Sequence, residues 1–229
     1  MKQINTLELY KKFINEEQNE KPKILVHACC APCSSEVINE LYKHGDVTIY
    51  YYNPNIYPYE EYIKRWDQFE KLPFDIKYIN GEYNEDIYLN LVSDVKNQKE
   101  GSIRCYKCYE FRIKETAKYA KEHNFDYFTT TLSISPYKNS KWINELCEKY
   151  SKEYNVEFIY SDFKKNDGYK KSIALSKENN LYRQEYCGCR YSLIEKEQKE
   201  NNGQKWPLFF NRKYSFIFKY LKIKNIITF

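Results

Sequence analysis

The chain has 229 residues, 42% of them hydrophobic and 30% charged, with a formal net charge of +5 at pH 7. This length and composition suit one domain with a substantial core and exclude a disordered or collagen-like chain. No apolar run reaches about 18 residues and the N-terminus has no uninterrupted apolar segment, so we predict a cytoplasmic protein without a membrane span. In a reducing compartment, the eight cysteines are expected to be ligands or redox groups rather than structural disulfides.

Strands and helices are predicted to alternate after an N-terminal helix at residues 1–22. The segments "KILVHA" and "SSEVINELYKHG" predict a buried strand and a helix that ends at Gly45. Later strands are expected within 46–55, 74–79, 125–139 and 156–163, and later helices at 57–72, 84–97, 104–124 and 140–155. This order predicts an α/β fold with a mainly parallel, doubly wound sheet. We expect a catalytic α/β domain at 23–195 and a basic, aromatic C-terminal extension at 196–229.

Three polar segments leave predicted strands at their carboxyl ends: "HACCAPCSS" at 27–35, "YYYNPNIYP" at 50–58 and "TTTLSISPYKN" at 129–139. Ligands of doubly wound sheets bind outside the carboxyl ends of the strands. We therefore expect the three segments to converge on one site.

Four cysteines in two elements have the spacing of a metal site. Cys105 and Cys108 lie at i and i+3 in "CYKC", which places both sulfurs on one face of a helix. With the adjacent pair Cys29 and Cys30 they supply four thiolates, enough for a tetrahedral zinc ion or a four-iron cluster. A closed zinc site, which would stabilise the fold without chemistry, is the alternative.

The remaining cysteines differ in their surroundings. Cys187 and Cys189 flank a glycine, so they could form a strained, redox-active disulfide or hold a second metal. Cys33 precedes a predicted helix and could be a fifth ligand, a contact to a second metal or a spare nucleophile. Cys147 stands alone at helical spacing and is predicted to be a buried structural thiol.

Several polar residues near these segments are candidate substrate contacts, because amides pair with base edges and cations bind phosphate. His27 and Tyr186 are hypothetical proton donors, although His27 could equally be a structural residue. Turn chemistry around Pro54 is an equally good explanation of the two asparagines in "NPN". The candidate substrate-binding residues are Asn53, Asn55, Arg65, Arg112, Lys138 and Tyr186.

The C-terminal segment 205–229 carries six basic residues and no acidic residue, interleaved with aromatic side chains. Such a segment can bind a polyanion, since cations neutralise phosphates and aromatic rings stack on bases. A packed helix with a basic face and an element on a membrane surface are the alternatives.

The sequence resembles the cobalamin-independent epoxyqueuosine reductases from about residue 22 to about residue 194. The resemblance rests on five motifs in order: "HACCAPCS", "YYNPNIYPYEEYIKR", "RCYKCYEFRIKETAKYA", "FTTTLSISPYKN" and "LYRQEYCGCRYS". It implies a core like that of HUP and PP-loop proteins and the reduction of epoxyqueuosine to queuosine in the anticodon loop of tRNA. The implied partners are this tRNA and an unidentified electron donor protein.

The resemblance also implies residue roles. Cys29, Cys30, Cys105 and Cys108 would hold a four-iron, four-sulfur (4Fe-4S) cluster. Cys187 and Cys189 would act catalytically, as a redox pair or on an additional mononuclear iron; some members carry an aspartate at the place of Cys33. Two rivals are an ATP-dependent iron–sulfur tRNA thiolating transferase and a zinc-stabilised RNA-binding module without catalysis. The first is disfavoured because "HACCAPCSS" has no glycine to cradle phosphates.

Overall fold

The computed structural model describes Tyr10, Phe13 and residues 21–203. Almost all of the predicted N-terminal helix and most of the predicted extension lie outside these residues. The chain divides into one compact unit up to Leu193 and a second from Ile194 onward. The boundary at residue 195 stays a proposal based on composition.

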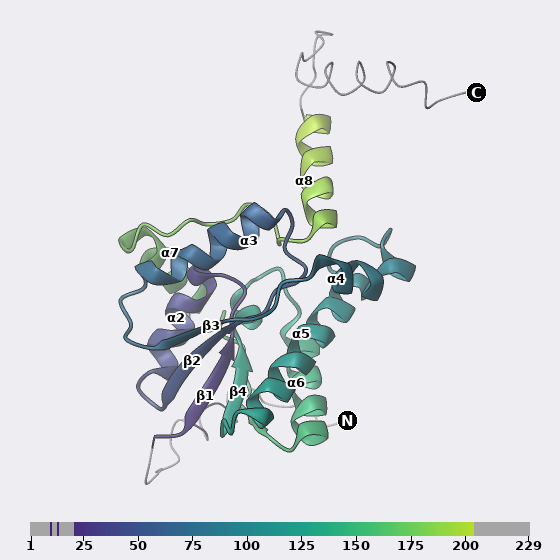
Figure 1. Cartoon of the computed structure of the whole chain (residues 1–229). Coiled ribbons are helices and arrows are strands. Elements are labelled where there is room, and N and C mark those ends of the chain that lie inside the picture. Colours follow the sequence, from purple (N-terminus) through teal and green to yellow (C-terminus); the bar gives the residue numbers. More distant parts are fainter. Residues whose placement is uncertain (1–9, 11–12, 14–20, 204–229) are drawn as a thin grey trace, which may run out of the picture. The chain divides into compact units, whose positions relative to one another are not determined.

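A five-stranded parallel sheet in the order β3-β2-β1-β4-β5 forms the centre of the first unit (Figure 1). The predicted parallel α/β fold is therefore confirmed. The last strand is shorter than the predicted segment 156–163. The strands are β1 (Lys23–His27), β2 (Asp46–Tyr51), β3 (Lys77–Asn80), β4 (Tyr127–Thr130) and β5 (Glu157–Phe158).

Helices cover both faces of the sheet (Figure 1). The predicted helices after residue 33 are present, although the segments 57–72 and 84–97 are each divided into a short α-helix and a 3-10 helix. Three elements were not predicted: η3 (Thr131–Ile134), α7 (Gly168–Glu178) and α8 (Arg190–Gly203). The others are α2 (Ala31–Leu41), α3 (Tyr59–Trp66), η1 (Asp67–Lys71), α4 (Glu85–Leu91), η2 (Ser93–Val95), α5 (Ile103–Glu122) and α6 (Ser140–Tyr154).

Alternation along β1 divides the core between the two faces, because successive strand residues point in opposite directions. Ile24 and Val26 belong to the apolar cluster that includes Val37 and Ile38 of α2. Leu25 belongs to the cluster formed with residues of α5 and α6. Both faces of β1 are thus buried, as expected for a central parallel strand. Among the described residues, no helix is both long and apolar enough to cross a membrane.

Ile49 of β2 is fully buried, so truncating it should leave a cavity in the core. We expect Ile49→Ala to lower the free energy of unfolding by about 3 kcal/mol. Ile87→Ala is the matched control, since Ile87 is 38% exposed, and it should change stability by less than about 1 kcal/mol. Chemical denaturation of both variants checks the prediction, and an equal effect would contradict it.

Candidate metal centre

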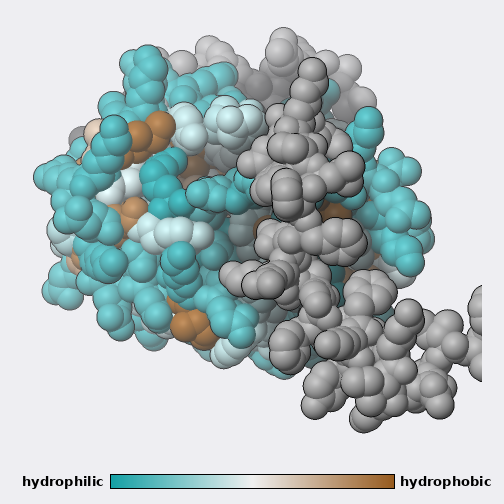
Figure 2. Space-filling view, turned by 90° about the horizontal axis from the view of Figure 1, so that it is seen from above, coloured by the Kyte–Doolittle hydropathy of each residue, from teal (hydrophilic) through white to brown (hydrophobic). Residues whose placement is uncertain are grey.

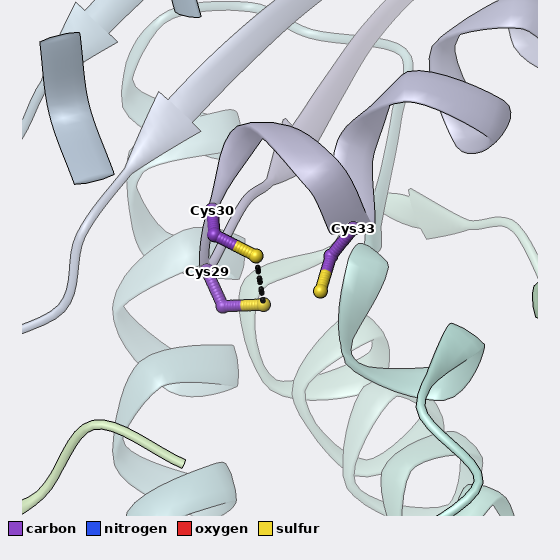
Figure 3. Close-up of side chains that lie close together, drawn as sticks. All are labelled: Cys29, Cys30 and Cys33. Carbon is purple, nitrogen blue, oxygen red and sulfur yellow. Dashed lines mark hydrogen bonds between the residues drawn. The ribbon is translucent and has the colours of Figure 1, made fainter. Parts of the chain in front are cut away.

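The end of β1 places three thiols at the start of α2. The strand stops at His27, Cys30 is the N-cap of α2, and a proline in the first turn suits a helix start. The Sγ atoms of Cys29, Cys30 and Cys33 all lie within 4.8 Å of one another (Figure 3). Because three soft thiols point to one place, this group could hold a metal ion.

The spacing within this group fits a single ion. The Sγ atoms of Cys29 and Cys30 are 3.8 Å apart. In a tetrahedral site with metal–sulfur bonds of about 2.3 Å, the sulfur atoms also lie about 3.8 Å apart. No thiol of α5 lies within 4.8 Å of all three members, among the residues described, so the compact group differs from the predicted ligand set.

The two thiols of α5 belong to different apolar clusters, one shared with Cys29 and Cys30 and the other with Cys189. Cys105 belongs to the same apolar cluster as Cys29 and Cys30, and its Sγ accepts a hydrogen bond from the Gly101 N–H at 3.2 Å. Cys108 packs with Cys189. Helix α5 therefore shares one apolar cluster with the cysteines after β1 and another with the cysteine before α8.

Hydrogen bonds also bring together the polar segments that were expected to converge. The Asn53 side chain donates to the Ala28 carbonyl at 2.8 Å, and the Cys29 N–H donates to Thr131 Oγ1 at 3.3 Å. Thr131 Oγ1 lies 3.6 Å from Cys29 Sγ as well. The loops after β1, β2 and β4 thus meet at one edge of the sheet.

Burial governs the protonation of most of these thiols. It raises the pKa of Cys108 to about 11 and the pKa of Cys187 to about 12. Hydrogen bonds from Cys30 and Cys33 instead lower the pKa of Cys29 well below its usual range. Among themselves the three thiols therefore favour one thiolate that accepts bonds from two neutral thiols, and metal binding would require those protons to leave.

Cations surround the thiols. Arg112 is 2% exposed, and its Nε donates to the Cys108 carbonyl at 3.2 Å while Nη1 donates to Asn53 Oδ1 at 3.1 Å. Burial lowers the pKa of Lys138, but nearby Cys29 and Cys187 raise it more, so the ammonium stays charged. These cations can balance the negative charge of thiolates that bind metal.

The other predicted substrate contacts are buried or hydrogen-bonded within the protein. Asn55 is 2% exposed, and its Oδ1 accepts no hydrogen bond from a described residue. Arg65 donates to the carbonyl oxygens of Tyr186 and Cys187. The Tyr186 hydroxyl donates to the Tyr57 carbonyl. Substrate binding by these residues stays a prediction.

Sequence reasoning missed two polar neighbours of the thiols. Gln184 Nε2 lies 3.1 Å from Cys30 Sγ and 3.9 Å from Cys33 Sγ, and its Oε1 has no partner among the described residues. The other is Thr131 of η3, described above. The sequence feature that could have indicated Gln184 is its position three residues before the Cys-Gly-Cys pair. Its amide can hydrogen-bond a thiolate and orient the group.

His27 is placed as a structural residue rather than a proton donor. Its ring is fully buried, with Nε2 3.1 Å from the Tyr52 carbonyl and Nδ1 2.8 Å from Thr130 Oγ1. Because a carbonyl only accepts, Nε2 carries the proton and Nδ1 accepts from the threonine. Burial and then the charge of Arg112 lower the pKa of His27 to about 3, so the ring is neutral at pH 7.

These features define an α/β protein with a thiol-rich centre at the carboxyl edge of a parallel sheet. A family model for epoxyqueuosine reductase QueH matches residues 24–195. Epoxyqueuosine reductase QueH of Staphylococcus epidermidis is 40% identical over 204 residues, covering 84% of this chain and 86% of the relative. The Thermotoga maritima protein of that name is 37% identical over 181 residues, covering 77% and 93%. The chain belongs to the epoxyqueuosine reductase QueH family and is an oxidoreductase.

A solved structure shares the fold at lower identity. The U34-tRNA thiolase NcsA from Methanococcus maripaludis with its 4Fe-4S cluster matches with a TM-score of 0.52 and 17% identity, covering 97% of this chain and 80% of that chain. This likeness supports the predicted fold class and says nothing about the site of this chain.

The neutral state of His27 makes stability depend on pH. Its pKa is about 3 in the folded protein against 6.5 ordinarily, so the unfolded chain binds the proton first as pH falls. The contribution of neutral His27 to the free energy of unfolding is complete above pH 6.5 and is lost as pH falls toward 3. Relative to His27→Gln, the native chain should lose about 1.4 kcal/mol per pH unit between roughly pH 6 and 4. Denaturation of both proteins across this pH range measures the effect. Equal slopes of unfolding free energy against pH for the two proteins would contradict the prediction.

Proposed function

We propose that this protein reduces epoxyqueuosine in the anticodon loop of tRNA to queuosine. Family membership over residues 24–195 is the observation that carries the proposal. The reaction consumes two electrons and two protons, converts the epoxide to an alkene and releases the oxygen as water. The thiols gathered at the carboxyl edge support redox chemistry at this place.

We propose that Cys29, Cys30, Cys105 and Cys108 hold a 4Fe-4S cluster, and that the thiolate surroundings also accommodate an additional mononuclear iron. A bound cluster would supply electrons one at a time. The buried, soft donor set and the nearby cations support this assignment. The compact spacing of Cys33 with the adjacent pair supports a role for Cys33 toward the additional ion.

Cys187 and Cys189 are the proposed catalytic pair. If both are thiols, forming a disulfide between them supplies the two electrons and two protons that epoxide removal consumes. Two electrons from a donor protein and two protons would then restore the dithiol. Lys138, whose charge acts on Cys187 and Cys29, is suited to stabilise negative charge on the departing oxygen.

The proposed partner is tRNA that carries epoxyqueuosine. Figure 2 shows that the coloured residues on the face seen from above are mainly hydrophilic, with hydrophobic residues in separate small groups. Polar and basic groups are the ones that contact nucleic acid backbones. Tyr137 is 82% exposed beside Lys138 and could stack on a base that is splayed from the anticodon loop.

Metal analysis of anaerobically purified protein tests the cofactor. We expect about four iron and four sulfide per chain, with a visible band that dithionite bleaches. Iron in excess of sulfide would support the additional ion. Zinc alone, with no colour after reconstitution, would contradict the redox mechanism and favour a zinc-stabilised RNA-binding module.

Replacing Cys187 with serine should lower turnover by about three orders of magnitude, because the pair could no longer exchange two electrons. The cluster absorbance should stay, since the proposed cluster ligands are unchanged. Single-turnover reduction of epoxyqueuosine tRNA measures the effect. Cys147→Ala is the matched control, because this thiol is buried in α6 and should leave turnover near that of the native chain. Loss of the cluster in Cys187→Ser would refute the division of roles.

A further inference from the structure

The backbone around the Cys-Gly-Cys pair is held by the segment that runs from the end of β2 into α3. Arg65 of α3 is 1% exposed. Its Nη1 donates to the Cys187 carbonyl at 3.2 Å, and its Nη2 donates to the Tyr186 carbonyl at 3.3 Å. The Tyr57 N–H donates to the Gly188 carbonyl at 2.8 Å. Three consecutive carbonyls therefore have donors from this one segment.

The guanidinium of Arg65 is itself fixed from the other side. Its Nε donates to Glu61 Oε1 at 2.7 Å, one helical turn earlier. The Tyr182 hydroxyl donates to Glu61 Oε2 at 3.1 Å. Arg65 also lies over the ring of Tyr186, with Cζ 5.3 Å from the ring centre. The planar guanidinium is thus held in one orientation. The carbonyls of Tyr186 and Cys187 accept from the same two nitrogens that would otherwise bind a phosphate.

Gly188 fits this contact for two reasons. Its φ angle is +124°, which side chains rarely allow. A Cβ atom there would lie 2.8 Å from Arg65 Nη1 and 3.2 Å from Ile56 Cγ1. Arg65 can approach the backbone this closely only because residue 188 has no side chain.

Cys189 is fixed separately from Cys187. Its Sγ accepts a hydrogen bond from the Ser192 N–H at 3.4 Å, at the start of α8. The contacts of Arg65 are instead on the Cys187 side of the glycine. The distance between the two sulfurs therefore depends on whether Arg65 holds the Cys187 backbone.

We infer that Arg65 is a positioning residue, which holds the Tyr186–Gly188 backbone so that Cys187 keeps a defined place beside Cys189. This role replaces the phosphate contact that the sequence suggested for Arg65. The inference rests on the proposed function where it concerns turnover. Its structural part, the restraint on Cys187, can be tested without substrate.

The first test measures the reactivity of Cys187 in anaerobically reconstituted protein, by iodoacetamide alkylation and peptide mass spectrometry. Arg65→Gln and Arg65→Lys should both raise the alkylation rate of Cys187 about tenfold, because a lysine cannot reproduce the two-pronged contact. Lys152→Gln, which removes an exposed cation of α6 outside this network, should leave the rate unchanged. Wild-type reactivity in Arg65→Lys would overturn the inference.

Cys147 reports on unfolding in the same experiment, because it is buried in α6 far along the chain. If Arg65→Gln raises the alkylation rate of Cys147 as much as that of Cys187, the variant has unfolded. The Gly188→Ala variant then tests the inference in its place. A methyl group at residue 188 should displace Arg65 and raise the reactivity of Cys187 alone. An unchanged Cys187 rate in Gly188→Ala would overturn the inference.

The second test separates positioning from phosphate binding. Positioning predicts that Arg65→Gln lowers kcat about tenfold or more while KM for tRNA and its salt dependence stay unchanged. A lost phosphate contact would instead raise KM and reduce the salt slope of binding by about 0.7 to 0.9. That second result would overturn the inference. Should the native chain not reduce epoxyqueuosine, the proposed function fails while the alkylation test of Arg65 still stands.

Discussion

The structure depends on burying a large number of thiols at the edge of a sheet without leaving their charge unbalanced. A buried thiolate is costly unless cations or hydrogen bonds compensate it. Arg112 and Lys138 carry positive charge into the thiol region, and Thr131 and Gln184 add polar contacts to sulfur. Because Arg112 also binds the backbone of α5 and the side chain of Asn53, its charge is tied to the fold rather than to solvent. If a redox-active metal is bound here, the same arrangement has to accommodate its change in charge.

The sequence predicts the elements whose apolar residues repeat with a clear period. β1 and α5 bury aliphatic and aromatic side chains, so their patterns stand out and the parallel fold follows. The residues that α7 buries are Gly168, Ser172 and Ser176, and small polar residues leave no apolar period to detect. The convergence of the three polar loops was predictable from topology alone. The hydrogen-bond partners of Asn53 and Arg65 could not be predicted, because the sequence does not show whether an amide or a guanidinium is buried. Gln184 contacts a thiol that is distant in the chain, which local patterns cannot reveal.

A doubly wound sheet commonly offers the N-terminus of its first helix to a phosphate, since free N–H groups point outward there. In this chain Cys30 is the N-cap of α2 and Cys33 follows within the first turn. A proline in that turn also removes one N–H donor. Thiols therefore lie at the helix start where such sheets commonly bind a phosphate. Fold likeness to a tRNA thiolase is compatible with this difference, because chemistry resides in the site and not in the fold.

The segment from Asn53 to Arg65 contains no cysteine, yet it contacts each of the three cysteine segments. Asn53 holds the carbonyl before Cys29 and, through Arg112, connects to the Cys108 carbonyl. Arg65 and Tyr57 hold the carbonyls around Gly188. Thiols supplied by separate elements can bind one centre only if their backbones keep a common register, and a metal ion alone would have to order them at a cost in binding free energy. A buried polar segment that fixes all three backbones beforehand lowers that cost. The motif that was predicted to contact substrate is therefore, in the folded protein, hydrogen-bonded to the backbones that carry the thiols.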